Sequence, residues 1–228
     1  MIKKISYINL IKQAQEDKKE IFKSLNKLFF RGEFILGREV DSFEKKICNF
    51  LKVKHCVALN SGTDALTLAL SLLGVKKGDE VITPPNSFIA STAAIVHLGA
   101  IPIFADVKND QNIDPKDIER KITKNTKAIM PVHLSGRPCE MRSILSISKK
   151  YKIPIVEDAA QAIGTKYNGK LVGTFGEVGC FSAHPLKNLN AIGDSGYLVT
   201  NNNKLAKQAK LLRNHGIENS NKIKSFGL

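Results

Sequence analysis

The chain has 228 residues, of which 43% are hydrophobic, enough to bury one substantial core or at most two small ones. The longest apolar run, residues 65–73, is broken by Thr67 and Ser71 and is too short to span a bilayer. The net charge is +14, but its lysines are spread along the whole chain without an aromatic-interleaved stripe. The sequence therefore favours a solvated lysine surface, with no nucleic-acid and no membrane partner.

The segment MIKKISYINL has no sustained apolar stretch behind its basic residues, so it predicts no signal peptide and we expect a cytoplasmic location. Residues 1–50 are predicted to form a helical arm packing on the main domain. Gly32 and Gly37 interrupt this arm before a second amphipathic stretch, residues 40–51. The apolar positions of its first part are Ile11, Ile21, Leu25 and Leu28.

From about residue 55 onward, short apolar runs alternate with helical patterns, which predicts βαβ units and a mostly parallel sheet. Seven strands are expected, at residues 55–59, 80–83, 101–105, 127–132, 153–157, 179–182 and 196–200. Helices are expected at residues 63–73, 87–98, 115–122, 140–150 and 204–213. Asp114 followed by Pro115 is a good helix start, because it pairs an N-cap with a first-turn proline.

The segment Asn60-Ser61-Gly62-Thr63-Asp64 lies between a predicted strand and a predicted helix. Free backbone N–H groups and the helix dipole at such a point can bind a phosphate group. Ordinary helix capping is the competing interpretation, since Ser, Thr and Gly are common at helix starts.

Asp158 directly follows a buried strand, and the carboxyl ends of parallel strands face the ligand crevice of such sheets. The small residues behind it and Gly164 indicate a close approach of the backbone to a flat or bulky group. A helix N-cap is the alternative role for this carboxylate.

Lys187 is one lysine among many, and a solvated surface charge is the default role of any of them. Its setting differs. It follows an apolar strand that ends at Ser182, then Pro185, and it precedes a tight loop at Gly193. A lysine enclosed in this way can lose its proton and act as a Schiff-base nucleophile. His184 fits an acid–base or a packing role equally well, and spacing assigns no role to His133 or His215.

The four cysteines, at positions 48, 56, 139 and 180, form no Cys-x-x-Cys pair, and no histidines stand at metal-ligand spacing. They are expected to be buried thiols, and no metal site is predicted.

Taken together, six segments resemble the DegT/DnrJ/EryC1/StrS aminotransferases, a branch of the fold-type-I pyridoxal-phosphate enzymes, in order and in spacing. These segments are FILGREVDSFEKKI, VALNSGTDALTLAL, GDEVITPPNSFIAS, PVHLSGRPCEM, VEDAAQAIGTKYNGKLVGTFGEVGCFSAHPLKNLNAIGDSGYLVT and LLRNHG. The resemblance implies a three-layer αβα large domain with a mostly parallel seven-stranded sheet over residues 51–228. It also implies that the small C-terminal domain of the family is missing, since the sequence stops at Leu228.

The resemblance further implies a binding site for pyridoxal 5'-phosphate. Lys187 matches the lysine that holds the cofactor covalently and then moves the proton, and Asp158 matches the partner of the ring nitrogen. Gln161 matches the residue beside the ring hydroxyl, and Phe88 the aromatic that stacks on the ring, with a core phenylalanine as its alternative. The phosphate is expected at Gly62, Thr63 and Ser182.

By this resemblance, the reaction transfers an amino group, with glutamate as the expected donor, to a keto sugar of a nucleotide-diphosphate sugar in polysaccharide or amino-sugar biosynthesis. A homodimer is expected, or association with a chain carrying the missing part. The related sugar 3-dehydratases have a histidine where this chain has Lys187, which disfavours them. The remaining alternative is a truncated fragment that is inactive or depends on a partner.

Overall fold

The computed structural model describes residues 8–219, 222–225 and 227. Its contacts divide the chain into two compact units, Met1–Phe43 and Glu44–Leu228, with the boundary inside helix α2 (Arg38–Leu51). The prediction that the N-terminal segment is no signal peptide concerns residues 1–7, which lie outside the described residues, as does the final residue 228. No helix in the described part is long and apolar enough to cross a membrane.

The first unit is built around helix α1 (Leu10–Arg31). The helix begins where the Asn9 side chain accepts a hydrogen bond from the Lys12 N–H, 3.0 Å away. It ends at Gly32, whose φ of 67° is a left-handed conformation that glycine adopts without strain. The predicted interruption at Gly32 is thus confirmed.

The second unit is built on seven strands that form one sheet, as predicted. The strands are β1 (His55–Leu59), β2 (Glu80–Thr83), β3 (Ile101–Phe104), β4 (Thr126–Ile129), β5 (Val156–Asp158), β8 (Val178–Ser182) and β9 (Gly196–Thr200). Hydrogen-bonded ladders join them as β1-β9-β8-β5 and as β3-β2-β4, and parallel bridges link β4 to β5. Only β9 among these strands runs antiparallel to its neighbours, β1 and β8.

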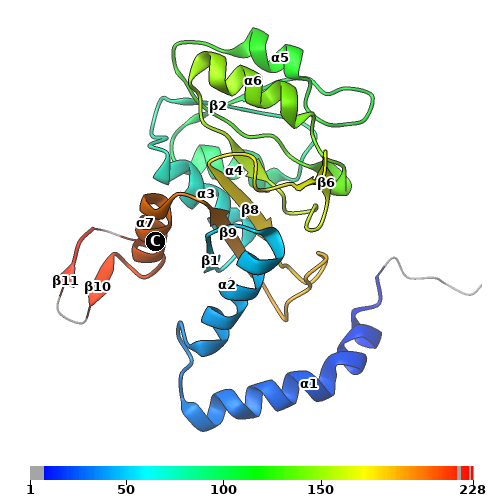
Figure 1. Cartoon of the computed structure of the whole chain (residues 1–228), viewed down its shortest axis with the longest axis vertical. Coiled ribbons are helices and arrows are strands. Elements are labelled where there is room, and N and C mark those ends of the chain that lie inside the picture. Colours follow the sequence, from blue (N-terminus) through cyan, green and yellow to red (C-terminus); the bar gives the residue numbers. More distant parts are fainter. Residues whose placement is uncertain (1–7, 220–221, 226, 228) are drawn as a thin grey trace, which may run out of the picture. The chain divides into compact units, whose positions relative to one another are not determined.

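Helices cover both faces of this sheet, so the predicted three-layer αβα architecture is confirmed (Figure 1). Along β2, Val81 belongs to one apolar core and its neighbour Ile82 to the other, as expected when side chains alternate between faces. The first core includes residues of α3 (Gly62–Leu72), α4 (Ile89–His97) and α7 (Asn203–Arg213). The second includes residues of α5 (Pro115–Lys121) and α6 (Met141–Tyr151).

Two hairpins were not predicted. Strands β6 (Lys166–Tyr167) and β7 (Lys170–Leu171) are joined by Asn168 and Gly169, both with positive φ, an Asn-Gly turn between strands too short to be recognised by periodicity. Strands β10 (Ile217–Asn219) and β11 (Lys222–Ile223) form in the polar final stretch, where no element was expected. The four cysteines are unpaired, and three of them, Cys56, Cys139 and Cys180, are buried.

Candidate functional site

A cavity of about 490 Å³ opens where β5 and β8 end, between the starts of α3 and α4 and the loop that joins β8 to β9. This is the ligand crevice expected of such a sheet. Seven of its lining residues are those named from the sequence: Gly62, Thr63, Phe88, Asp158, Gln161, Ser182 and Lys187. Residues separated by more than a hundred positions along the chain thus face one space.

The start of α3 forms one wall and rests directly on the sheet. Ser61 caps the helix, with its hydroxyl accepting a hydrogen bond from the Asp64 N–H at 3.0 Å. A Cβ atom on Gly62 would lie 2.9 Å from the Cβ of Ser182, and one on Gly196 only 2.2 Å from the Ser61 carbonyl carbon. The two glycines therefore permit the helix start to approach β8 and β9 this closely. Capping by Ser61 is therefore present, and it occupies only one of the N–H groups that the start of a helix leaves free.

Asp158, the last residue of β5, is buried and faces the cavity. Its Oδ1 accepts a hydrogen bond from the Ala160 N–H at 3.1 Å, and its Oδ2 accepts one from the Ser91 hydroxyl at 2.8 Å. No helix begins after it, so the alternative N-cap role is wrong. Burial raises the pKa of this carboxyl above its usual 3.8, and the bonds from Ser91 and Ala160 oppose that rise.

Lys187 lies in the loop between β8 and β9, which is closed by backbone hydrogen bonds. The Lys187 N–H donates to the His184 carbonyl, and the Ala183 N–H donates to the Ser195 carbonyl, both at 2.8 Å. The side chain is half-buried and reaches the cavity. Within the described part of the chain, its ammonium group makes no hydrogen bond or ion pair, so the amine is available to a ligand.

His184 also lines the cavity, but it is tied to its own loop. Its Nδ1 accepts the Leu186 N–H at 3.1 Å, and its Nε2 lies 3.9 Å from Asp194 Oδ1. Phe88 occupies the N-cap position of α4, with 68% of its surface exposed, so it is not a core phenylalanine.

Gln161 is oriented by a strained turn. Its Oε1 accepts the Ser135 N–H at 2.8 Å, and Ser135 has a left-handed φ of 52° within the short helix η1 (Leu134–Gly136). The Thr165 hydroxyl binds the Gly136 carbonyl at 2.8 Å and ties the same turn to the segment that follows Gln161. Because its oxygen is engaged, Gln161 can offer its NH₂ group as a donor to the cavity.

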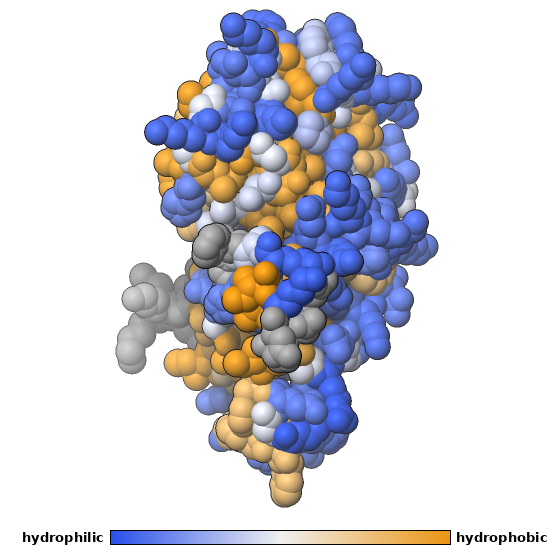
Figure 2. All heavy atoms as spheres, turned by 90° about the vertical axis from the view of Figure 1, so that its left-hand side faces the viewer, coloured by the Kyte–Doolittle hydropathy of each residue, from blue (hydrophilic) through white to orange (hydrophobic). Residues whose placement is uncertain are grey.

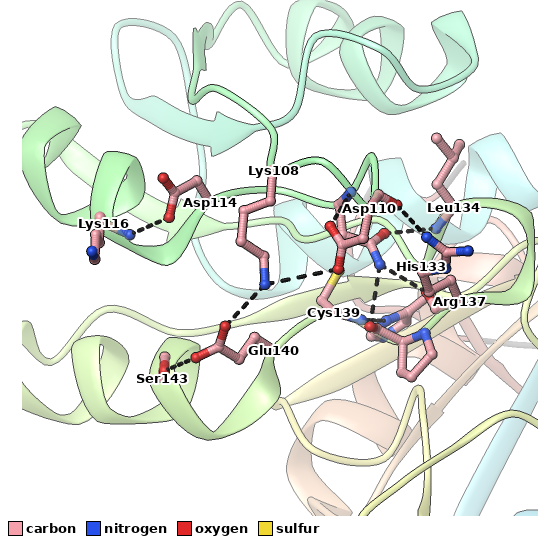
Figure 3. A network of polar contacts seen from close by, with 12 residues as sticks. Lys108, Asp110, Asp114, Lys116, His133, Leu134, Arg137, Cys139, Glu140 and Ser143 are labelled. Atoms are coloured by element: carbon pink, nitrogen blue, oxygen red, sulfur yellow. Dashed lines mark hydrogen bonds and ion pairs between the residues drawn. The ribbon is translucent and has the colours of Figure 1, made fainter.

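A polar network holds Leu134 and Arg137, the residues at the two ends of this turn (Figure 3). The buried Asn112 accepts the Leu134 N–H at 3.3 Å and donates to the carbonyls of Arg137 and Pro138. At its outer edge, the Lys108 ammonium binds Glu140 Oε2 at 2.9 Å, which raises the pKa of Lys108. The turn that orients Gln161 is therefore fixed on both sides.

Glu157 and His133 form a second, fully buried pair next to the site. The Glu157 carboxylate accepts the N–H groups of Gly173, Phe175 and Gly176 at 2.6–2.8 Å, and it lies 3.0 Å from His133 Nε2. His133 Nδ1 accepts the Cys139 N–H at 3.0 Å, so the hydrogen on the ring is at Nε2, pointing to Glu157. This pair connects the segment that follows β4, the end of β5 and the loop before β8.

Comparison with known proteins decides the family. The model of the family described as "DegT/DnrJ/EryC1/StrS aminotransferase family" matches residues 15–227 of this chain. The chain belongs to this family. Among curated relatives, it is 46% identical over 213 residues to a dTDP-3-amino-3,6-dideoxy-alpha-D-galactopyranose transaminase of Aneurinibacillus thermoaerophilus, covering 93% of this chain and 59% of the relative. It is 41% identical to a "pleiotropic regulatory protein" of Geobacillus stearothermophilus, covering 93% of this chain and 57% of that one.

Solved structures of the family agree in fold. DesV of S. venezuelae, in complex with a ketimine intermediate, matches with a TM-score of 0.94 and 36% identity, over 98% of this chain and 60% of DesV. NtdA of Bacillus subtilis, with bound cofactor PMP, matches with a TM-score of 0.93 and 34% identity, over all of this chain and 53% of NtdA. The chain thus spans between half and two thirds of the length of these family members.

The sequence assigned no role to four residues that hold the site or its surroundings: Ser91, Asn112, His133 and Glu157. Ser91 and Asn112 stand in ordinary helix and loop contexts, and their partners lie far away in the sequence. A signal existed only for Glu157, since it stands beside Asp158 at the end of a buried strand, where a charged side chain needs partners. Among the described residues, no group of His, Cys, Asp and Glu side chains is arranged to hold a metal ion.

Proposed function

We propose that this chain carries the pyridoxal 5'-phosphate site of an aminotransferase that acts on a keto sugar linked to a nucleotide diphosphate. One observation carries the proposal: a buried carboxylate, an unpaired lysine and a glycine-built helix start all face one cavity. These are the groups that a cationic ring nitrogen, a carbonyl group and a phosphate require.

The residues present fit the phosphate group. The backbone at Gly62 and Thr63 offers N–H donors at the positive end of α3, and the close contact with Ser182 brings a hydroxyl to the same place. The Ser182 Oγ accepts the His184 N–H at 3.2 Å, so its hydrogen is free to be donated to an anion.

Asp158 and Lys187 supply the charges for the reacting part of the site. When bound, the cofactor supplies a carbonyl group and an electron-accepting ring. The Asp158 carboxylate would hold a proton on the ring nitrogen, and Lys187 Nζ would bind the cofactor covalently and afterwards carry the proton that leaves the substrate carbon. Burial of Asp158 keeps water from competing for the same proton.

Gln161 and Phe88 would fix the ring. The NH₂ group of Gln161, directed by Ser135, suits an anionic ring oxygen, and the ring of Phe88 at the cavity edge suits stacking. Both roles restrict how the ring lies relative to Lys187, which is the precondition for a productive proton transfer.

The substrate class is supported by relatives whose names state it. Besides the dTDP-sugar transaminase, a 44% identical relative from Acidithiobacillus ferrooxidans is named as a UDP-N-acetyl-3-dehydro-alpha-D-glucosamine 3-aminotransferase. We infer an amino donor of the glutamate type and a role in amino-sugar or polysaccharide biosynthesis. A cytoplasmic location fits the four unpaired cysteines.

We further infer that a second polypeptide covers the cavity, either a second copy or a chain carrying the remaining part of the family fold. Leu186, Leu189 and Ile192, in the loop that holds Lys187, are 55%, 38% and 80% exposed. Figure 2 shows one face of the molecule, on which apolar areas lie between hydrophilic ones. Exposed apolar side chains beside a site are typical of an interface. The absence of association in analytical ultracentrifugation of the purified chain at micromolar concentration would count against this inference.

The cofactor site is tested by titrating the purified chain with pyridoxal 5'-phosphate, reducing it with borohydride and mapping the modified peptide by mass spectrometry. We expect a modification at Lys187 that Lys187→Ala abolishes. Lys170→Ala, which removes an exposed lysine on β7, is the matched control and should leave it unchanged. Modification spread over several surface lysines would contradict the proposed site.

The reaction is tested by incubating the loaded chain with glutamate and a panel of keto sugar nucleotides, and following 2-oxoglutarate and the amino sugar by mass spectrometry. Because the chain spans only part of the length of its relatives, it is assayed both alone and together with a chain that carries the remaining part of the family fold. If the chain binds the cofactor but shows no turnover in either case, the aminotransferase activity is wrong and only cofactor binding remains as its function.

A further inference from the structure

Ser91 is a buried serine in the first turn of α4, with 1% of its surface exposed. Its hydroxyl donates to Asp158 Oδ2 at 2.8 Å, and its oxygen accepts the hydroxyl of Ser87 at 3.0 Å. The two partners Ser91 and Asp158 are 67 positions apart in the sequence.

Capping of α4 does not account for this hydroxyl. Ser91 does not cap α4, because the N-cap position is held by Phe88, which makes no side-chain capping bond. The other buried residues of α4, Ala94 and Ile95, are apolar, and alanine is the better helix former at such a position. A buried hydroxyl stays favourable only through its hydrogen bonds, and this one donates to Asp158.

Asp158 depends on few donors. Its carboxylate, 5% exposed, receives one hydrogen bond on each oxygen, from Ala160 and from Ser91. The Ala160 bond comes from the backbone and is present in any variant, so Ser91 is the only side chain that donates to this carboxylate within the described residues. The titratable groups around it are His133, Cys139, Glu157, Cys180 and Lys187.

We propose that Ser91 is a positioning residue that orients the Asp158 carboxylate and keeps it anionic for the ring nitrogen of the cofactor. The inference rests on the proposed function. Loss of the hydroxyl removes a bond that favours the charged form, so Asp158 takes up a proton at a higher pH and no longer matches a cationic ring nitrogen.

The test compares the pH dependence of cofactor affinity in wild type, Ser91→Ala and Ser91→Thr, by fluorescence titration of the purified chain. In Ser91→Ala we expect about tenfold weaker binding at neutral pH, and the acid limit of binding displaced upward by about one pH unit. Ser91→Thr keeps the hydroxyl and should restore most of the affinity. Ser87→Ala is the matched control. Ser87 bonds to Ser91 and not to Asp158, so this change should alter cofactor affinity less than about twofold.

A double-mutant cycle shows whether Ser91 acts through Asp158. In the Asp158→Asn background, Ser91→Ala should weaken cofactor binding no further. Circular dichroism checks that each variant is folded. In the cofactor-free chain, Ser91→Ala should lower stability more at about pH 8 than at about pH 4, because only the ionised Asp158 depends strongly on the lost donor.

The outcomes separate the two hypotheses. If wild type and Ser91→Ala both become modified at Lys187 with the same pH profile, the role of Ser91 is wrong and the proposed function stands. If wild type takes up no cofactor at Lys187, the proposed function fails and the role of Ser91 falls with it. Equal losses of cofactor affinity in Ser91→Thr and Ser91→Ala would also overturn the proposal, since they would show that packing, and not the hydroxyl, matters at this position.

Discussion

Strand β5 ends in two acidic neighbours whose side chains alternate to opposite sides of the sheet. Glu157 is fully enclosed and meets donors supplied entirely by the protein: three backbone N–H groups and His133. Asp158 meets only two donors and faces a cavity. One carboxylate is thus satisfied within the fold, whereas the other retains the capacity to accept a further hydrogen bond.

Burial alone does not distinguish the two carboxylates, since both residues are buried. The number of donors that the protein itself supplies, and the presence of a space in front of the remaining lone pairs, separate the two roles. The following substitutions test this distinction.

The largest effect is expected at Glu157. Glu157→Ala leaves three backbone N–H groups and the buried His133 without an acceptor, and it should lower the free energy of unfolding by about 3–5 kcal/mol. Urea denaturation followed by circular dichroism measures this loss. Glu157→Gln keeps one acceptor oxygen and should lose less. An unfolding free energy of Glu157→Ala within about 1 kcal/mol of wild type would show that the pair is not structural.

Asp158→Asn should have the opposite profile. The fold has little to lose, because the amide oxygen can still accept one of the two hydrogen bonds. Cofactor affinity should fall about 10- to 100-fold, the equivalent of one hydrogen bond to a charged group. Fluorescence titration gives the affinity and urea denaturation gives the stability. A large loss of stability with unchanged cofactor affinity would mean that Asp158, like Glu157, has a structural role.

The pH dependence of the cofactor-free chain sharpens the comparison further. Burial raises the folded-state pKa of Asp158 above 3.8, so its contribution to stability is fully present below the unfolded pKa. That contribution is lost as the pH rises from about 4 through the raised folded pKa, because the folded state then pays for a buried charge. Asp158→Asn should remove this decline. Denaturation midpoints measured between about pH 4 and 8 test it, and an identical decline in both proteins would assign the decline to other groups.

The smallest effect is expected at the outer edge of the network in Figure 3. The Lys108 side chain, 34% exposed, forms its ion pair with Glu140 in contact with solvent. Lys108→Ala should therefore cost only about 0.5 kcal/mol, less still at high salt. A loss above about 2 kcal/mol in thermal unfolding would mean that this edge holds the Gln161 turn in place.

The sequence predicted the sheet, Asp158 and the helix start at Gly62 from local signals, whereas the family resemblance was needed to name Phe88 and Gln161. Apolar runs mark each buried strand, and Asp158 and Ser182 stand at strand ends, where a parallel sheet collects its functional side chains. The strand limits differ by a few residues, as with β5, which was expected at 153–157 and is Val156–Asp158.

The contacts that support the site were out of reach for the same reason. Ser91, Asn112 and His133 bind partners that lie 67, 22 and 24 positions away, and no periodicity connects such pairs. The strained conformation of Ser135 is equally invisible, because serine gives no local signal for a positive φ.

The placement of β9 has a consequence for how the protein is made. This last strand of the main sheet inserts between β1 and β8, pairing Leu59 with Gly196, and the backbone at Gly196 is also the surface on which the start of α3 rests. During synthesis, β1 and α3 must wait for some 140 further residues before this partner leaves the ribosome. Such long-range pairing slows folding and exposes unpaired strands in the interval. The part of the cavity wall formed by the start of α3 is therefore among the last parts of the molecule to become complete, and translation that stops before residue 196 yields a chain without its support.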